Sequence, residues 1–139
     1  MECRVKIPAM VENWDEVYNI LQKFIGEIDI DNKIKNDVLV SAEEIFVNIA
    51  KYAYPSSGGD VLIEAEFYPK SGVLYLKFKD RGVPFDPTKL RSPDTSLGSQ
   101  ERKIGGLGIF MVRKMMDNMQ YFYEDGFNNL LITKKIKFV

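Results

Sequence analysis

A single carboxylate ends a strand whose other residues on the same face are apolar. In the segment VLYLKFKD, Leu74, Leu76 and Phe78 alternate with a tyrosine and two lysines. A strand with a period of two therefore places Asp80 on the leucine face. Leaving a buried carboxylate without a hydrogen bond costs about 1–3 kcal/mol. We expect a donor beside Asp80, supplied by the protein, by water or by a ligand, and the amino group of adenine is one such donor.

The residues after this carboxylate allow two interpretations. The segment DRGVPFDP is rich in turn-forming residues, so a simple strand exit and turn explains it. Alternatively, Gly82 lets the backbone approach a flat ring closely, at the floor of a pocket.

A carboxylate and an amide lie one turn apart on a helix predicted from about 31–53. Glu44 and Asn48 share one face with Ser41 and Lys51, and this stripe lies away from the isoleucine stripe of the same helix. The asparagine carbonyl suits a hard cation such as Mg²⁺, while the carboxylate one turn earlier can polarise a nucleophile. An ordinary solvated helix face explains the same residues.

Three glycines, Gly105, Gly106 and Gly108, open the last predicted helix, and Arg102 and Lys103 lie shortly before them. Uncovered N–H groups at a helix start favour phosphate, by about 0.3–1 kcal/mol per charge at exposed sites. A flexible loop feeding a helix is the alternative. No GxxxxGK[ST] motif is present. Taken in order, the carboxylate–amide pair, the Asp80 segment and the glycines predict a nucleotide pocket.

Composition limits the remaining chemistry. At 139 residues and 45% hydrophobic, the chain is expected to be one soluble, cytoplasmic domain spanning 1–139. No apolar run approaches the roughly 20 residues that span a bilayer. One cysteine excludes an internal disulfide, and the absence of histidine excludes a Ser-His-Asp triad and a His-ligated metal. With 19 basic and 20 acidic residues, general attraction to nucleic acid or to an anionic membrane is not expected.

The elements that must position these residues follow from hydrophobic periodicity. Asn13 and Asp31 are the expected N-caps of the first two helices. The last two strands are expected to turn at 126–128, and Lys134 falls on an otherwise apolar face. Residues 81–104 have no period, and we predict that 88–104 is a lid that orders with nucleotide. Strands are predicted at 3–8, 61–68, 73–80, 119–125 and 129–138, and helices at 13–28, 31–53 and from the glycines to about 118.

The joint order and spacing of these motifs resemble a known family. The matching segments are Glu44-x-x-x-Asn48-x-x-Lys51, Asp80-x-Gly82-x-Pro84-Phe85-Asp86-Pro87 and Gly105-Gly106-Leu107-Gly108-Ile109. They are similar to the N, G1 and G2 boxes of the GHKL (Bergerat-fold) ATPases. The stretch GGLGIFMVRKMMD, followed by Gly126-x-Asn128-x-Leu130, resembles more closely the anti-sigma factor serine/threonine kinases of bacterial partner-switching. Related ATPases often carry Gly-Thr near the last strand, where this chain reads GFNN.

The resemblance implies a fold and a set of roles. The fold would be an α/β sandwich, with a mixed, mainly antiparallel sheet of about five strands and helices on one face. Glu44 would be the general base, Asn48 the Mg²⁺ ligand and Lys51 a phosphate neighbour. Asp80 would anchor adenine above Gly82. The other implied nucleotide-binding residues are Pro84, Gly105, Gly106, Leu107, Gly108 and Ile109.

Two functions remain open on this resemblance. In the first, the chain is an Mg²⁺- and ATP-dependent serine/threonine kinase that phosphorylates a STAS-domain antagonist protein, with a sigma factor and a second copy of the chain as further partners. In the second, it is a nucleotide-gated module that captures a partner protein without turnover.

Overall fold

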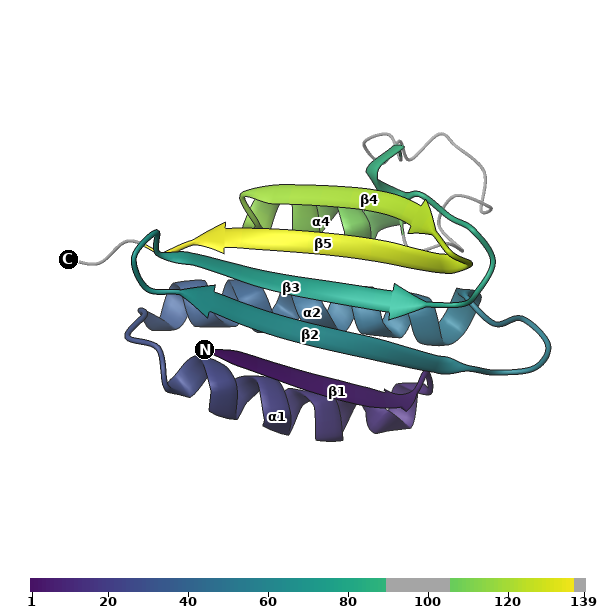
Figure 1. The fold of residues 1–139 in the computed structure, drawn as a ribbon, viewed down its shortest axis with the longest axis horizontal. Coiled ribbons are helices and arrows are strands. Elements are labelled where there is room, and N and C mark those ends of the chain that lie inside the picture. Colours follow the sequence, from purple (N-terminus) through teal and green to yellow (C-terminus); the bar gives the residue numbers. More distant parts are fainter. Residues whose placement is uncertain (90–105, 137–139) are drawn as a thin grey trace.

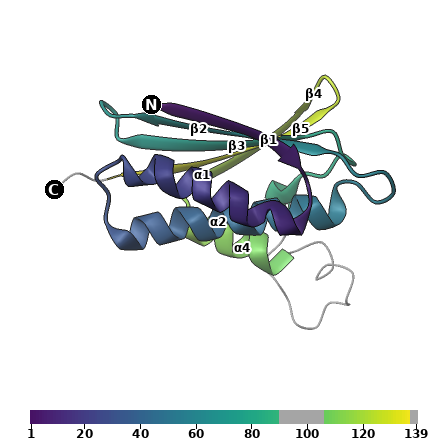
Figure 2. The same cartoon turned by 90° about the horizontal axis from the view of Figure 1, so that it is seen from below.

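A five-stranded sheet carries three helices on one face, as the two views in Figures 1 and 2 show. The computed structural model describes residues 1–89 and 106–136. Every neighbouring pair in the strand order β1-β2-β3-β5-β4 is antiparallel. The elements are β1 (Glu2–Pro8), η1 (Val11–Asn13), α1 (Trp14–Gly26), α2 (Asn32–Tyr52), β2 (Asp60–Tyr68), β3 (Val73–Asp80), η2 (Pro87–Lys89), α4 (Gly106–Met115), β4 (Asn118–Glu124) and β5 (Phe127–Lys135). The expected α/β sandwich with helices on one face is confirmed, although the described strands pair only in the antiparallel sense and not in a mixed sheet.

Alternation of side chains determines which face of the sheet is buried. Along β3 every second side chain is buried from Leu74 to Asp80, as the sequence predicts. Ile63, Phe78 and Leu130 are register partners on β2, β3 and β5, so they form one apolar row under the helices. Because Asp80 continues this face, its carboxylate lies at the edge of the core.

The two hairpins differ in how well their turns were predicted. Gly72 closes the β2–β3 hairpin with a φ of +71°, in the gap between the strands predicted at 61–68 and 73–80. The β4–β5 hairpin turns at Asp125 and Gly126, with φ of 54° and 80°, earlier than the predicted 126–128. Asn128 therefore belongs to β5, where its side chain shares the inward face of Leu130.

Both predicted N-cap residues occupy the N-cap position of their helix, but only one of them caps it with its side chain. The Asp31 carboxylate accepts a hydrogen bond from the Ile34 N–H at 2.8 Å and caps α2. Asn13 makes no side-chain cap, because it ends η1 and its Nδ2 instead donates to the Pro8 carbonyl at 2.9 Å. In the part of the chain that the structure describes, no helix is both long and apolar enough to cross a bilayer.

Helix α2 lies in the middle of the helical layer. It contacts α1, α4 and β3. Ser41 contradicts the alternative of an ordinary solvated face, because this side chain is completely buried. Glu44, one turn later, is exposed, and Asn48 is half-buried. The predicted stripe therefore runs from the interior to the surface.

A hydrogen bond to the end of α4 explains why Lys134 lies on the apolar face of β5. Its ammonium group donates to the Met115 carbonyl at 2.6 Å, at the last residue of α4. A cation at a helix C-terminus satisfies a carbonyl that has no partner within the helix and interacts favourably with the helix dipole. Lys134 thus fastens the end of α4 to the sheet.

Replacing this lysine tests the fastening. Lys134→Met keeps most of the apolar stem but removes the charged donor, and we expect it to lower the free energy of unfolding by about 1–2 kcal/mol. Lys135→Met, at the exposed neighbour, is the matched control and should change it by less than about 0.5 kcal/mol. Urea unfolding measures both, and equal effects would mean that the Met115 contact contributes nothing.

Candidate functional site

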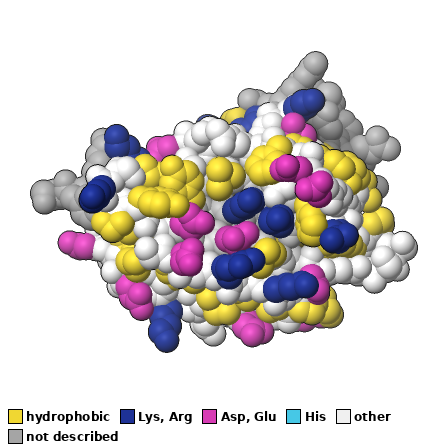
Figure 3. Space-filling view, viewed as in Figure 1, with side chains coloured by type: hydrophobic (Ala, Val, Ile, Leu, Met, Phe, Trp, Pro, Cys, Tyr) yellow, Lys and Arg dark blue, Asp and Glu magenta, His cyan; other side chains and the backbone are white. Residues whose placement is uncertain are grey.

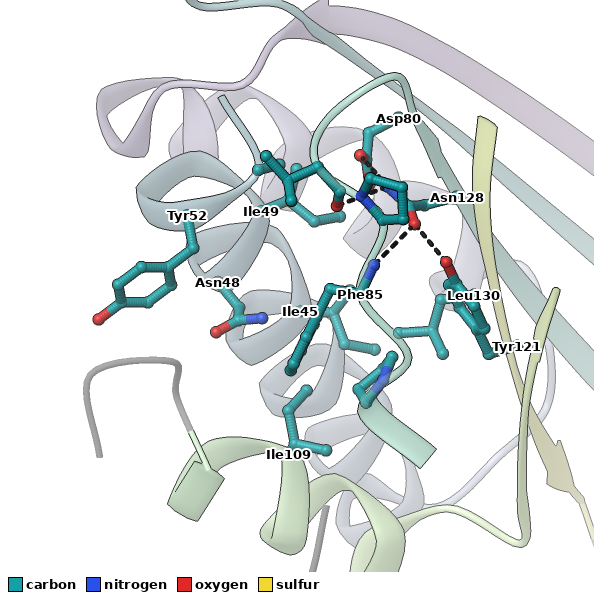
Figure 4. Close-up of a pocket in the computed structure, with 14 residues that line it drawn as sticks. Ile45, Asn48, Ile49, Tyr52, Asp80, Phe85, Ile109, Tyr121, Asn128 and Leu130 are labelled. Atoms are coloured by element: carbon teal, nitrogen blue, oxygen red, sulfur yellow. Dashed lines mark hydrogen bonds between the residues drawn. The ribbon is translucent and has the colours of Figure 1, made fainter. Parts of the chain in front are cut away.

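A cavity of about 190 Å³ lies between α2, the segment after β3, the start of α4 and the two C-terminal strands (Figure 4). Four of the predicted site residues line it, namely Asn48, Asp80, Pro84 and Ile109. The remaining lining is mostly apolar and suits a flat, partly hydrophobic ring. It consists of Ile45, Ile49, Tyr52, Ala53, Val83, Phe85, Pro87, Tyr121, Asn128 and Leu130.

The Asp80 carboxylate is the charged group of this cavity. Its side chain is only 4% exposed, and Oδ1 accepts hydrogen bonds from the Gly82 N–H at 2.8 Å and from Asn128 Nδ2 at 2.9 Å. The expectation that a donor stands beside it is confirmed, and both donors come from the protein. Within the described chain, all hydrogen bonds to this carboxylate go to Oδ1, so Oδ2 remains available to a ligand.

Burial controls the ionisation of this group. Removal from water raises the pKa of Asp80 above its usual range, and the hydrogen bonds from Asn128 and Gly82 lower it in part. The charged form is therefore held in place by two donors but is less favourable than in water. A ligand that brings a further donor to Oδ2 would stabilise it.

Asn128 lines the candidate site but is absent from the site residues that the sequence predicts. Its Nδ2 lies 2.9 Å from Asp80 Oδ1 and 3.2 Å from the carbonyls of Gly82 and Val83. Its Oδ1 accepts from the Phe85 N–H at 3.2 Å and from the Tyr121 hydroxyl, as Figure 4 shows in part. One amide thus joins β5 to β3, to β4 and to the segment after β3. The parity that identified Asp80 would have found it, had the last strand been started before residue 129.

Gly82 makes its close approach to the protein itself. A Cβ atom here would collide with the backbone carbonyl and the side chain of Ala53, just after the end of α2. The Val83 N–H donates to the same carbonyl at 2.9 Å. Gly82 therefore lets the chain after β3 dock on α2 and form one wall of the cavity. Its predicted position beneath a ring stays a prediction.

Asn48 presents an unsatisfied acceptor at the cavity. Its Oδ1 is buried and has no hydrogen-bond partner in the described part of the molecule. An unpaired buried carbonyl is unfavourable, so it is suited to a ligand that binds oxygen. Among the described residues, no group of three or more His, Cys, Asp or Glu side chains could hold a metal. Asn48 therefore fits Mg²⁺, which usually takes one or two protein ligands and completes its shell with phosphates and water.

The predicted base lies against the start of α4. A Cβ atom at Gly108 would collide with Oε2 of Glu44, so the glycine makes room for the carboxylate. The tertiary structure thus joins the first and third motifs, which are more than 50 residues apart. Glu44 is exposed and is not part of the cavity lining.

The remaining predicted residues are placed only in part. Lys51 is exposed on α2 and does not line the cavity. Gly106 is the first residue of α4. Gly105, Arg102 and Lys103 lie outside the described residues, as do the side chain of Leu107 and most of the predicted lid 88–104.

The chain belongs to the histidine kinase-like ATPase domain family, whose model matches residues 7–134. This match confirms the GHKL resemblance. A protein named serine-protein kinase RsbW from Bacillus cereus is 30% identical over 105 residues, which cover 73% of this chain and 64% of that protein. A protein of the same name from Listeria monocytogenes is 26% identical over 105 residues, covering 72% of this chain and 65% of that protein.

Two solved structures share the fold. The crystal structure of the RsbU and RsbW domains of a Mycobacterium tuberculosis protein superposes with a TM-score of 0.70 at 15% identity, covering 98% of this chain and 32% of that one. The histidine kinase domain of a blue-light activated kinase from Erythrobacter litoralis gives a TM-score of 0.60 at 13% identity, covering 94% and 62%. The layered architecture described above is therefore that of the ATPase family.

The raised pKa of Asp80 leads to a test by pH. Because the folded-state pKa lies above that of the unfolded chain, ionised Asp80 opposes folding at neutral pH, and this cost disappears as the pH falls through the raised pKa. Asp80→Asn keeps an oxygen for both donors but removes the charge. We expect this variant, without ligand, to unfold at higher urea than the native protein at pH 7, and the gain to shrink toward pH 4.

The exposed Asp29→Asn change is the matched control and should stay within about 0.5 kcal/mol of the native protein at both pH values. A native protein more stable than Asp80→Asn at pH 7 would mean that its two donors overcompensate the cost of burial.

Proposed function

We propose that residues 1–139 form one ATP- and Mg²⁺-binding domain that phosphorylates serine or threonine on a partner protein. The observation that carries the proposal is the buried Asp80 carboxylate, which lines an apolar cavity with one oxygen held by the protein and the other left for a ligand. The family is one of ATPases. Two relatives of this chain are named serine-protein kinase.

Adenine is the base that this carboxylate would select. Its exocyclic amino group can donate to Asp80 Oδ2, whereas guanine presents a carbonyl at the corresponding position and would leave two acceptors facing each other. A buried polar site of this kind discriminates strongly, because the wrong ligand leaves its groups unpaired. Pro84 and Ile109, which line the same cavity, would pack against the ring.

The phosphates would lie between α2 and the start of α4. Asn48 Oδ1 would supply the protein ligand of Mg²⁺, which would neutralise charge on the phosphates. Backbone N–H groups at Gly106, Leu107 and Gly108 would face the phosphates at the first turn of α4, with Gly105 before them and Lys51 nearby.

Glu44 would act on the incoming hydroxyl. Its carboxylate lies over Gly108, at the helix start where the terminal phosphate would be placed. A carboxylate there can accept the proton of a serine or threonine hydroxyl as that oxygen attacks phosphorus. The rest of phosphoryl transfer requires positioning and charge stabilisation, which the cavity and the helix start would supply.

The partners are proposed from the relatives. The chain spans 64% of the length of the Bacillus relative. We infer a STAS-domain antagonist as the phosphorylated protein, a sigma factor as a second ligand, and a homodimer acting in the cytoplasm.

Removing the proposed metal ligand should separate metal from base recognition. Asn48→Ala is expected to weaken Mg²⁺-ATP binding by about 10-fold or more, since metal-site substitutions typically cost 10- to 100-fold, and to leave metal-free ATP within about 2-fold. Asn36→Ala, exposed on the same helix, is the matched control. Calorimetry with and without Mg²⁺ measures both, and equal losses in the two titrations would remove Asn48 as the metal ligand.

Removing the proposed base tests the kinase itself. Glu44→Gln should retain ATP affinity within a few fold but lower phosphoryl transfer by about 10²–10⁴, the usual effect of losing a positioned base. Glu43→Gln, which removes the neighbouring carboxylate, is the matched control. The assay follows labelled phosphate from ATP to the STAS-domain protein recovered with the chain from its native host.

Two results would contradict this assignment. Native protein that captures its partner with ATP but never labels it would be a nucleotide-gated binding module. Equal labelling by native and Glu44→Gln proteins would keep the kinase but remove Glu44 as its base.

A further inference from the structure

A second hollow lies on the opposite face of the sheet from the helices. Its lining includes four cationic side chains, Arg4, Lys6, Lys79 and Arg81, and Asp60 is the one carboxylate among the described residues that line it. In Figure 3, which faces this side, dark blue side chains gather over the half of the sheet where β1 and β3 end. We call this hollow the basic groove. Its excess of positive charge contrasts with the whole chain, whose net charge is −1.

The sheet arranges these cations in two rows. Arg4 and Lys6 are two residues apart on β1, and Lys79 and Arg81 lie at the end of β3. Strand β2 runs between these two rows (Figure 1). Lys6 and Lys79 are both register partners of Leu62 on β2. Cations two residues apart on a strand are about 6.6 Å apart, and the two rows are about 10 Å apart, given the usual rise and strand spacing. Leu62 therefore lies in the basic groove between two rows of positive charge.

The protein itself neutralises little of this charge. Within the described residues, Arg4 has one ion pair, with Glu64 at 3.6 Å, and both partners reach solvent. Lys79 and Arg81 instead lie over the same aromatic ring, 4.8 and 4.2 Å from the centroid of Phe127. Contacts of this kind contribute about 0.5–1 kcal/mol at exposed sites, and they restrict both side chains. Both cations thus contact one ring, and within the described residues neither has an ion pair.

We propose that the basic groove binds an extended acidic segment of a partner protein, lying over β2. Side chains on one face of an extended chain recur about every 6.6 Å, which is also the spacing of the cations within each row. Successive carboxylates on the face turned toward the sheet can therefore pair with the β1 row and the β3 row alternately. Leu62 and Phe127 offer apolar contact between the charges. The complementarity is one of charge and of spacing.

The rest of the face favours a short acidic segment over nucleic acid. Glu2 and Glu66 are register partners at the other end of β1 and β2, and Glu64 lies between Arg4 and Lys77 in its row. A long polyanion crossing the sheet would be repelled by these carboxylates, whereas a segment confined to the groove avoids them.

The groove adjoins the cavity without entering it. Arg81 follows Asp80 directly, and its N–H donates to the Tyr54 hydroxyl at 2.7 Å, which in turn donates to the Asp60 carbonyl at 2.7 Å. The two sites thus share the end of β3 but open on opposite faces. The proposal does not depend on nucleotide binding, and a protein partner could occupy the groove while the cavity is filled.

The test uses the full chain and a fluorescein-labelled decapeptide of alternating Glu and Gly, with a Gln–Gly decapeptide as the uncharged probe. We expect the acidic peptide alone to bind, with an affinity that falls as salt rises. Lys6→Gln combined with Lys79→Gln should weaken binding by about 10-fold or more, as expected for two lost ionic contacts of about 1 kcal/mol each. Lys77→Gln removes the same kind of charge from the same face, outside the groove, and should change binding by less than about 2-fold.

Several outcomes would overturn the proposal. They are absence of peptide binding at millimolar concentration in low salt, and equal weakening by Lys77→Gln, which would indicate diffuse charge. Tighter, equally groove-dependent binding of a ten-nucleotide thymidine oligomer would assign the groove to nucleic acid. A native dimer that dissociates on sedimentation when Lys6 and Lys79 are replaced would assign it to a second copy of the chain.

Discussion

The Asp80 carboxylate depends on the Asn128 amide, and the candidate site depends on both. A buried carboxylate without donors would be unfavourable, and Asn128 supplies a donor at 2.9 Å while holding the carbonyls of Gly82 and Val83 with the same nitrogen. Its oxygen holds the Phe85 N–H. Satisfying one charge therefore also shapes the segment that walls the cavity.

Helix α2 connects this polar centre to the rest of the fold. Gly82 docks the segment after β3 on Ala53, and Gly108 leaves room for Glu44 at the other packed helix. In both places a missing side chain allows close packing of α2 with its neighbour. Asn48 lies between the two contacts and lines the cavity, and its buried Oδ1 has no hydrogen-bond partner among the described residues. The helix thus carries the groups expected to meet the metal and the attacking hydroxyl.

The two faces of the sheet differ in composition and in candidate role. The inner face is apolar apart from a few residues, and each of these has an identified polar contact: Asp80 and Asn128 with each other, and Lys134 with the end of α4. The outer face is covered by no described element and carries charges in separate patches. Period-two alternation produces both faces from the same strands. It thereby places a candidate ligand cavity and a basic groove on opposite sides of one strand end.

Local patterns determined most of the elements. Parity along β3 located Asp80, the Asp31 cap located the start of α2, and motif order predicted the family to which the chain belongs. Tertiary structure decided the rest, since contacts between distant segments leave no periodic signal. Ser41 is buried because neighbouring helices cover α2, and Asn128 meets Asp80 only through the pairing of β3 with β5. The sequence thus determined which residues could do chemistry, and packing decided which of them share a site, because a side chain's partners depend on register and layer order and not on its own neighbours in the chain.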